Sequence, residues 1–140
     1  MARRAGPLRI LVVEDDEGDA MMIREALEAV ATPATLNRVA DGEEALTFLR
    51  RTADPRPDMI LLDLNMPRMD GRETLVELKR DPDLRSIPVV ILTTSDDVRD
   101  VSRMYREHAS AFVTKPMDFD ALESVVQQIR QFYENIAKLP

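Results

Sequence analysis

The 140-residue chain contains no cysteine, one histidine and few aromatic residues, which make up 4% of the sequence. The absence of cysteine excludes disulfide bonds and thiolate metal sites, and it fits a reducing compartment. Long hydrophobic runs are also missing. The amino terminus (residues 1–4) is basic, but the apolar segment from Ile10 to Val13 is too short for a signal peptide or a membrane span. We therefore expect a cytoplasmic protein without membrane association.

Basic residues are too few for nucleic-acid binding. The chain has 19 Lys and Arg against 26 Asp and Glu, which gives a net charge of -7. Duplex binding needs a cluster of cations that displaces counterions, so the composition predicts no DNA partner. A chain of 140 residues suits one compact domain, and we expect residues 1–140 to form it without an effector domain.

Short apolar runs alternate along the chain with longer segments of helical periodicity, a pattern typical of strand–helix units with a parallel sheet. We expect five strands and five helices, with the most apolar strand at 59–62 and a weaker edge strand at 35–40. A loop containing two prolines is expected at 51–58. The predicted helix N-caps are Asp41, Asp70, Ser95 and Asp118.

Four of the apolar runs end in polar residues of the types that phosphoryl transfer requires. These residues are Glu14 and Asp15, Asp63, Thr93, and Lys115. Any one of them could be only a helix cap or a turn residue, but four strand ends together favour a shared site. Because the carboxyl ends of neighbouring parallel strands meet in one crevice, we expect the three carboxylates, the hydroxyl and the amine to converge.

Three carboxylates in one crevice require positive charge nearby. At a separation of about 4 Å, each pair repels by roughly 4 kcal/mol at an effective dielectric constant of about 20. Mg²⁺ would supply two positive charges and Lys115 the third, and Mg²⁺ prefers hard oxygen ligands. We therefore predict a Mg²⁺ site formed by Glu14, Asp15 and Asp63.

Asp63 is the expected nucleophile, because a carboxylate oriented by a metal can accept a phosphoryl group. Thr93 can donate a hydrogen bond to one phosphoryl oxygen, and Lys115 can pair with another. Thr94 and Ser95 are alternatives to Thr93.

The remaining polar residues receive ordinary structural interpretations. His108, the only histidine, lies near a predicted helix end and is expected at the surface. The other acids near the strand ends are expected to be solvated residues at helix starts, where negative charge is favourable: Asp16, Asp19, Asp96, Asp97 and Asp100.

These residues, together with the segment DLNMPRMDG at 63–71, resemble the receiver domain of bacterial two-component response regulators. The resemblance covers about 8–133. It implies an α/β, flavodoxin-like fold of three layers, with a five-stranded parallel sheet in the order 2-1-3-4-5. By position in the motif, Asp63 is similar to the phosphoacceptor, Glu14 and Asp15 to the acidic pair, and Asn65 to the residue that gives its backbone carbonyl to Mg²⁺.

The resemblance also implies a switch. Thr93 and Phe112 are similar to the hydroxyl and aromatic pair that report phosphorylation, and Lys115 to the lysine that pairs with the phosphate. In the family, the bond from that lysine to the following proline, here Pro116, is usually cis. The family often carries a glycine near the end of the fourth helix, where this chain has 107–109 (Glu-His-Ala), so the cap geometry there is open.

The segments 57–67, 87–95 and 113–116 resemble those of stand-alone receivers that serve phytochrome-type sensor kinases. This implies phosphoryl transfer from a sensor histidine kinase, slow autodephosphorylation without conventional enzyme activity, and output through protein contacts or phosphorelay. Two alternatives are a receiver-like interaction module that is not phosphorylated and a phosphatase of the aspartyl-phosphate type. The phosphatase would need a general acid where the chain has Asn65.

The last predicted helix, at 118–137, would extend about 30 Å, which is longer than a five-stranded receiver needs. Its residues Phe132, Tyr133 and Ile136, followed by Leu139, are expected to project as an apolar patch. We predict a symmetric homodimer through the fourth helix, fifth strand and fifth helix. The alternative is that these residues fold back onto their own domain.

Overall fold

The computed structural model of the protein describes residues 6–29, 33–51 and 56–140. The basic amino terminus and half of the predicted loop at 51–58, residues 52–55, lie outside these ranges. Within them, five β-strands alternate with five α-helices, and a short π-helix follows the last of these. The predicted alternation of strands and helices is thus confirmed.

The strands are short, as expected for a small α/β domain. Their bounds are β1 (Leu8–Val13), β2 (Ala34–Val39), β3 (Met59–Leu62), β4 (Val89–Thr93) and β5 (Ala111–Thr114). The helical segments are α1 (Glu17–Glu28), α2 (Gly42–Leu49), α3 (Gly71–Arg80), α4 (Val98–Arg106), α5 (Phe119–Gln131) and the π-helix η1 (Phe132–Ile136).

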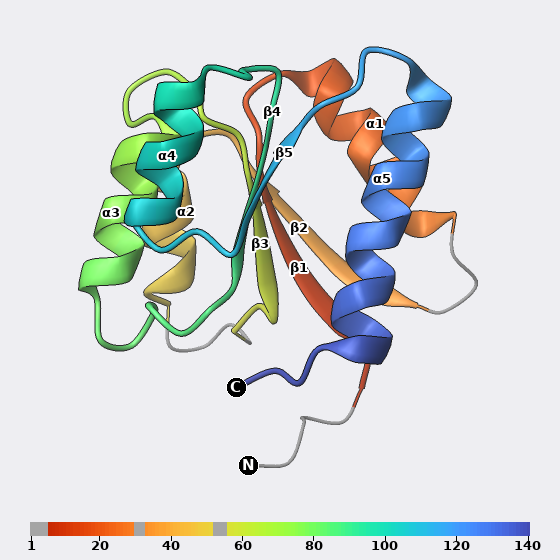
Figure 1. Cartoon of the computed structure of the whole chain (residues 1–140). Helices are drawn as coiled ribbons and strands as arrows, with labels where there is room; N and C mark the ends of the chain where they lie inside the picture. The colour runs from red at the N-terminus through yellow and green to blue at the C-terminus, as the bar shows by residue number, and fades with distance from the viewer. Residues whose placement is uncertain (1–5, 30–32, 52–55) are drawn as a thin grey trace.

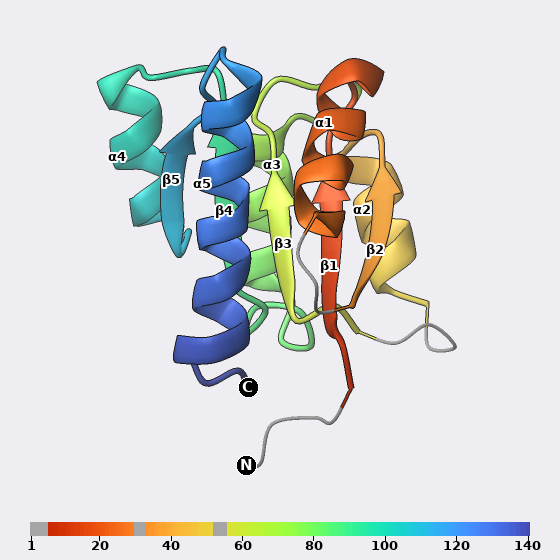
Figure 2. The same cartoon turned by 90° about the vertical axis from the view of Figure 1, so that its right-hand side faces the viewer.

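All strand pairs are parallel, and the sheet order is β2-β1-β3-β4-β5, which confirms the predicted flavodoxin-like topology. Figure 1 shows the sheet between two helical layers, with α1 and α5 on one face and α2, α3 and α4 on the other. Figure 2 shows α1 and α5 in front of the strands. Because all pairs are parallel, the carboxyl ends of the five strands lie at the same end of the sheet.

Two apolar clusters hold the three layers together, because successive strand side chains point to opposite faces. The cluster on the side of α2, α3 and α4 includes Leu11, Ile60, Leu62, Leu75 and Met104. The cluster on the side of α1 and α5 includes Ile10, Ile23, Leu61, Leu122 and Val126. All residues of β3 are buried, as expected for a parallel strand that is covered on both faces.

Three of the four predicted N-caps are confirmed. Asp41, Asp70 and Asp118 each accept a hydrogen bond from a backbone amide of the first turn of α2, α3 and α5. Asp70 and Glu73 form a reciprocal capping box at the start of α3. These caps fix where three of the helices begin, beside the carboxyl ends of the strands.

The prediction of Ser95 as the cap of α4 is wrong. The helix begins two residues later, at an N-cap formed by Asp97, whose carboxylate accepts from the amide of Arg99. The hydroxyl of Ser95 instead donates to Asp100 Oδ2 at 2.9 Å. An Asp-rich segment offers several possible caps, and Asp97 is the one that takes this position.

The end of α4 shows how the chain manages without the glycine common in the family. His108 adopts left-handed backbone, with a φ of 72°. Its amide donates to the carbonyl of Tyr105 at 3.0 Å, and the amide of Ala109 donates to that of Met104 at 2.9 Å. This is the Schellman arrangement of a helix end. His108, predicted to be a surface residue, is exposed.

The carboxyl-terminal segment differs from its prediction. The α-helix ends at Gln131, and the wider turn of η1 is closed by a hydrogen bond of 2.8 Å from the amide of Ala137 to the carbonyl of Phe132. Figure 1 shows the chain then turning back beneath the sheet. Tyr133 and Leu139 are consequently buried in the core on the α1 and α5 side, which corrects the expectation that they project.

Phe132 and Ile136 do project, with exposed fractions of 46% and 71%. The predicted apolar patch therefore shrinks to these two side chains, while its role in a dimer stays a prediction. Among the described residues, no helix combines the length and apolar character needed to cross a membrane.

One buried cation joins α5 to α1. Arg130 is 1% exposed, and its Nη1 donates to the carbonyl of Leu27 near the end of α1. Its Nε donates to the carboxylate oxygens of Glu134 at 3.0 and 3.2 Å. A guanidinium this deeply buried is stabilised only when its donors are paired, and here they find partners on both sides.

Candidate functional site

The carboxylates that follow β1 and β3 lie together, as predicted. Glu14, Asp15 and Asp63 each offer an oxygen, and these atoms all lie within 4.8 Å of one another. Glu14 and Asp63 are buried, whereas Asp15 is exposed and opens the cluster to solvent. The amide of Asp63 donates to the carbonyl of Val13 at 3.0 Å, which fixes the backbone of Asp63 beside the acidic pair.

Lys115, at the end of β5, reaches into this cluster. Its Nζ donates to Glu14 Oε1 at 2.6 Å and to Asp19 Oδ2 at 2.8 Å. Burial alone would lower the pKa of Lys115, but the hydrogen bonds to Asp19 and Glu14 outweigh it and raise the pKa above its usual value. The expectation that Asp19 is merely solvated is therefore wrong, since its carboxylate is one of the two that pair with Lys115.

The bond between Lys115 and Pro116 is trans, so the expectation of a cis bond is wrong for this structure. The direction of Lys115 follows instead from its two carboxylate partners and from its own backbone. Its amide donates to the carbonyl of Thr93 at 2.6 Å, which holds the lysine beside the end of β4.

Negative charge in the cluster is only partly neutralised. Burial raises the pKa of Glu14 to about 7, against the hydrogen bond from Lys115, and the nearby charge of Asp63 adds to the increase. The donor set consists of hard carboxylate oxygens, one of them exposed, which is what Mg²⁺ and Mn²⁺ bind in proteins. The residues present therefore fit a divalent cation.

Thr93 and Phe112 occupy neighbouring strands on the same face of the sheet. Phe112 pairs in register with Ile91, and Thr93 follows two residues later, so the two side chains are diagonal neighbours. Thr93 is fully buried, while Phe112 is partly buried against the core on the α4 side. The amide of Phe112 donates to the hydroxyl of Tyr105 at 3.2 Å, which ties β5 to α4.

The structure distinguishes among the predicted hydroxyls. Thr93 ends β4 directly, whereas Thr94 is exposed and the hydroxyl of Ser95 is bonded to Asp100. Asn65 is exposed two residues beyond Asp63. The role of its carbonyl as a metal ligand stays a prediction.

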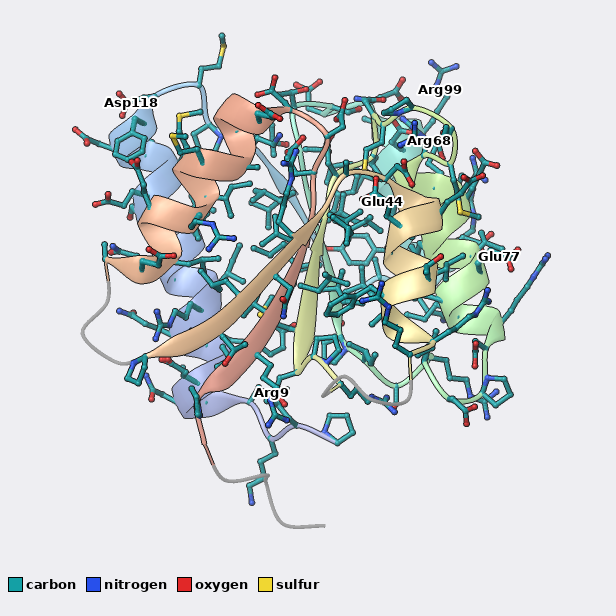
Figure 3. The ribbon with its side chains drawn as sticks, turned by 180° about the vertical axis from the view of Figure 1, so that it is seen from behind. Arg9, Glu44, Arg68, Glu77, Arg99 and Asp118 are labelled. Atoms are coloured by element: carbon teal, nitrogen blue, oxygen red, sulfur yellow. The ribbon has the colours of Figure 1, made fainter. Side chains whose placement is uncertain are left out.

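Arg68, which sequence reasoning did not single out, supports the loop after Asp63. Arg68, with a φ of 61°, pairs with the buried carboxylate of Asp41 and with Glu44 at 3.5 Å. Burial would raise the pKa of Asp41, but the backbone amide of Glu44 and the guanidinium of Arg68 hold it below its usual value. Figure 3 places Arg68 and Glu44 at the same end of the molecule as Asp118, opposite Arg9.

A second ion pair links α3 to α4. Arg72 donates from Nε and Nη2 to the two carboxylate oxygens of Asp100, at 2.8 and 2.7 Å, and Ser95 donates to the same carboxylate. The hydrogen bond from Arg72 lowers the pKa of Asp100 to about 2. Asp100 is therefore a structural anchor of α4 rather than a solvated acid, which corrects its sequence-based interpretation.

Replacing Asp100 with Asn should lower the free energy of unfolding by about 1–2 kcal/mol at neutral pH. A carboxyl with a lowered pKa stabilises the folded chain above its unfolded pKa, near 3.8, and that stabilisation is lost as the pH falls toward 2. Urea unfolding at several pH values should show the difference between the two proteins shrinking below pH ~4. Asp96→Asn, an exposed neighbour, is the control, and a difference independent of pH would contradict the assignment.

The chain matches the response regulator receiver domain family over residues 10–127. It is 41% identical over 138 residues to the response regulator Rcp1 of Synechocystis sp., covering 96% of this chain and 94% of that protein. It is 38% identical over 130 residues to the probable methanogenesis regulatory protein FilR2 of Methanothrix harundinacea, covering 91% of this chain and 84% of the relative.

Solved structures agree with this match. The phosphorylated cyanobacterial phytochrome response regulator RcpA superimposes with a TM-score of 0.93 at 40% identity, covering 96% of this chain and 99% of the other. The Mn²⁺-bound form of Rcp1 gives a TM-score of 0.89 at 40% identity, with the same coverage. Together with the strand order and the acidic cluster beside Lys115, these similarities show that the chain belongs to the response regulator receiver domain family of two-component systems.

Proposed function

We propose that the protein takes a phosphoryl group from a sensor histidine kinase onto Asp63 in a Mg²⁺-dependent reaction. The observation that carries this proposal is the convergence of three carboxylate oxygens within 4.8 Å of one another, beside the buried ammonium of Lys115. Structures of relatives in a phosphorylated and in a Mn²⁺-bound form support it, because these relatives cover nearly the whole chain.

In the transfer, a carboxylate oxygen of Asp63 forms a bond to the phosphorus of a phosphohistidine. The bond between phosphorus and nitrogen breaks, its electron pair stays on the imidazole, and the product on Asp63 is an acyl phosphate. Glu14, Asp15, Asp63 and the carbonyl of Asn65 would hold the cation, which supplies positive charge to the phosphoryl oxygens. The side chain of Asn65 cannot protonate a leaving group, so multiple turnover on phosphate esters is not expected.

The phosphoryl group also recruits two side chains from the neighbouring strands. Lys115 exchanges part of its pairing with Glu14 and Asp19 for a phosphoryl oxygen, and Thr93 donates its hydroxyl to another. Movement of Thr93 frees space on the face of the sheet that it shares with Phe112. The result is a two-state change read by α4 and β5, which are already joined through Tyr105.

Incubation with acetyl phosphate tests this function. With Mg²⁺, intact mass should show one added phosphate that then decays, and chelation with EDTA should slow the transfer at least about tenfold because the charge on the phosphoryl oxygens is no longer neutralised. No added phosphate would indicate an interaction module instead. Rapid, steady release of phosphate would indicate a phosphatase.

The proposed context is a cytoplasmic receiver domain formed by residues 1–140, which works with a phytochrome-type sensor kinase and signals through protein contacts or phosphorelay. The similarity to Rcp1 and RcpA supports the choice of kinase class, since RcpA is a phytochrome response regulator. Purified candidate kinases loaded with labelled phosphate would identify the partner by the rate of transfer.

We further propose a homodimer through α4, β5 and α5. Phe132 and Ile136 are exposed in η1, which directly follows α5, and such side chains gain free energy when a partner covers them. Light scattering over a dilution series should report a dimer at high micromolar concentration. Ile136→Asp should raise the dissociation constant of this dimer at least about tenfold. Met21→Asp, at an equally apolar exposed position on α1, should have no effect. A monomeric wild-type chain would contradict the proposal.

A further inference from the structure

A side chain outside the acidic cluster holds the loop that carries it. Arg38 lies near the end of the edge strand β2, in register with Val12 of β1. Its Nε donates to the carbonyl of Glu14 at 2.9 Å, and its Nη2 donates to the carbonyl of Asp15 at 3.1 Å. One planar guanidinium thus spans two consecutive carbonyls, both belonging to residues of the cluster.

From this contact we infer that Arg38 is a positioning residue for the divalent cation. The inference rests on the proposed function, because it concerns the same metal site. Arg38 acts through the backbone: it fixes the peptide units of Glu14 and Asp15, so that their carboxylates are aimed at the position of the cation before the cation binds. Its Nε and Nη2 each donate to a loop carbonyl, and a protonated guanidinium cannot itself be a metal ligand.

The loop between β1 and α1 needs such a support. Sheet pairing extends one residue beyond β1, through the amide of Glu14 and the carbonyl of Val39 at 3.0 Å. The next fixed point is Asp16, whose carboxylate caps α1 by accepting from the amide of Asp19 at 2.7 Å. Arg38 bridges the stretch between these points, where the exposed metal-ligand candidate Asp15 lies.

Because of the charges at the site, a positioning role and a purely electrostatic role of Arg38 predict opposite changes in the affinity for the cation. The carboxylates of Glu14, Asp15 and Asp63 lie together, and the ammonium of Lys115 pairs with Glu14 and with a fourth carboxylate, that of Asp19. Arg38 adds a second positive charge at the loop, so its charge opposes cation binding. If Arg38 acted by charge alone, its removal would tighten binding. If it acts by positioning, its removal weakens binding although the site becomes more negative.

Calorimetric titration of the metal-free full chain with Mn²⁺ distinguishes these outcomes. Arg38→Gln should bind Mn²⁺ about 10-fold more weakly than the wild type, the range typical of residues that orient metal ligands. Arg38→Lys keeps the charge, but a single ammonium cannot span both carbonyls as the guanidinium fork does, so it should also bind more weakly. Arg24→Gln, which removes the same charge from the exposed face of α1, should bind like the wild type.

Urea unfolding of each variant in EDTA separates positioning from general stability. Weaker Mn²⁺ binding by both Arg38 variants, in proteins that are folded in EDTA, supports the inference. Unchanged or tighter binding by Arg38→Gln overturns it, as does wild-type affinity in Arg38→Lys. If the wild-type chain itself binds no Mn²⁺, the metal site of the proposed function fails, which is a different result from a change confined to the Arg38 variants.

Discussion

Replacing Asp63 with Asn should abolish formation of the acyl phosphate, with a loss of more than about 1000-fold in the rate of transfer. The amide of Asn lacks the negatively charged oxygen that forms the bond to phosphorus. Its size and its oxygen acceptor match those of Asp, so the hydrogen bond of 2.9 Å from the amide of Leu64 to Oδ1 can persist. The loss would therefore reflect chemistry rather than a change of shape.

The measurement is intact mass after incubation with acetyl phosphate and Mg²⁺. Asp96→Asn, at an exposed position after β4, should be phosphorylated like the wild type. Asp63→Asn should also be at least as stable as the wild type, because it removes the charge of Asp63 that raises the pKa of buried Glu14. Uptake of acid-labile phosphate by Asp63→Asn at the wild-type level would contradict the assignment of the acceptor.

Replacing Gly71 with Ala should lower the free energy of unfolding by about 3 kcal/mol or more. A Cβ atom at this position would lie 2.0 Å from the carbonyl oxygen of Asp63 and 2.7 Å from the Cα of Leu64. These are backbone atoms, which cannot rotate away as a side chain can. The amide of Gly71 also donates to the carbonyl of Leu64 at 2.9 Å, so the two segments cannot separate without losing that bond.

This loss is a large part of the stability of a typical domain, about 5–15 kcal/mol, and urea unfolding would measure it. Gly18→Ala provides a matched control, because the added Cβ would meet only the carboxylate of Asp16 at 3.3 Å. That carboxylate is the flexible end of a side chain, so the change should stay within about 1 kcal/mol. Equal stability of the two variants would show that the approach of Gly71 to Asp63 is not a constraint.

The sequence was sufficient to predict the sheet and the composition of the acidic cluster, because both depend on local patterns. An apolar run followed by Asp63 or Thr93 marks the end of a buried strand, and parallel pairing then brings the ends together. The cluster of Glu14, Asp15 and Asp63 follows from this topology alone. Roles that depend on transferred phosphate remain predictions that the experiments above address.

Partners chosen by long side chains could not be predicted in this way. Lys115 pairs with Asp19, which is far away in the sequence, and Arg38 reaches two carbonyls of the loop that follows the neighbouring strand β1. These pairings depend on distances in the folded chain, and no periodic pattern in the sequence predicts them. The backbone at the end of the chain could not be predicted either. The exposure predicted for Tyr133 rested on one long α-helix over 118–137, but the α-helix ends at Gln131 and Tyr133 lies buried in the π-helix that follows.

One helical layer pairs α1 with α5, the first and last α-helices, whereas the opposite layer consists of three helices that are consecutive in the chain. The apolar side of α1, with Ile23 and Leu27, is covered by Leu122 and Val126. During synthesis from the amino terminus, this side of α1 can pack against the first strands but lacks its partners on α5 until α5 has left the ribosome. A nascent chain that already contains Asp63 thus still exposes an apolar strip, and the layer can close only after α5 has been synthesised.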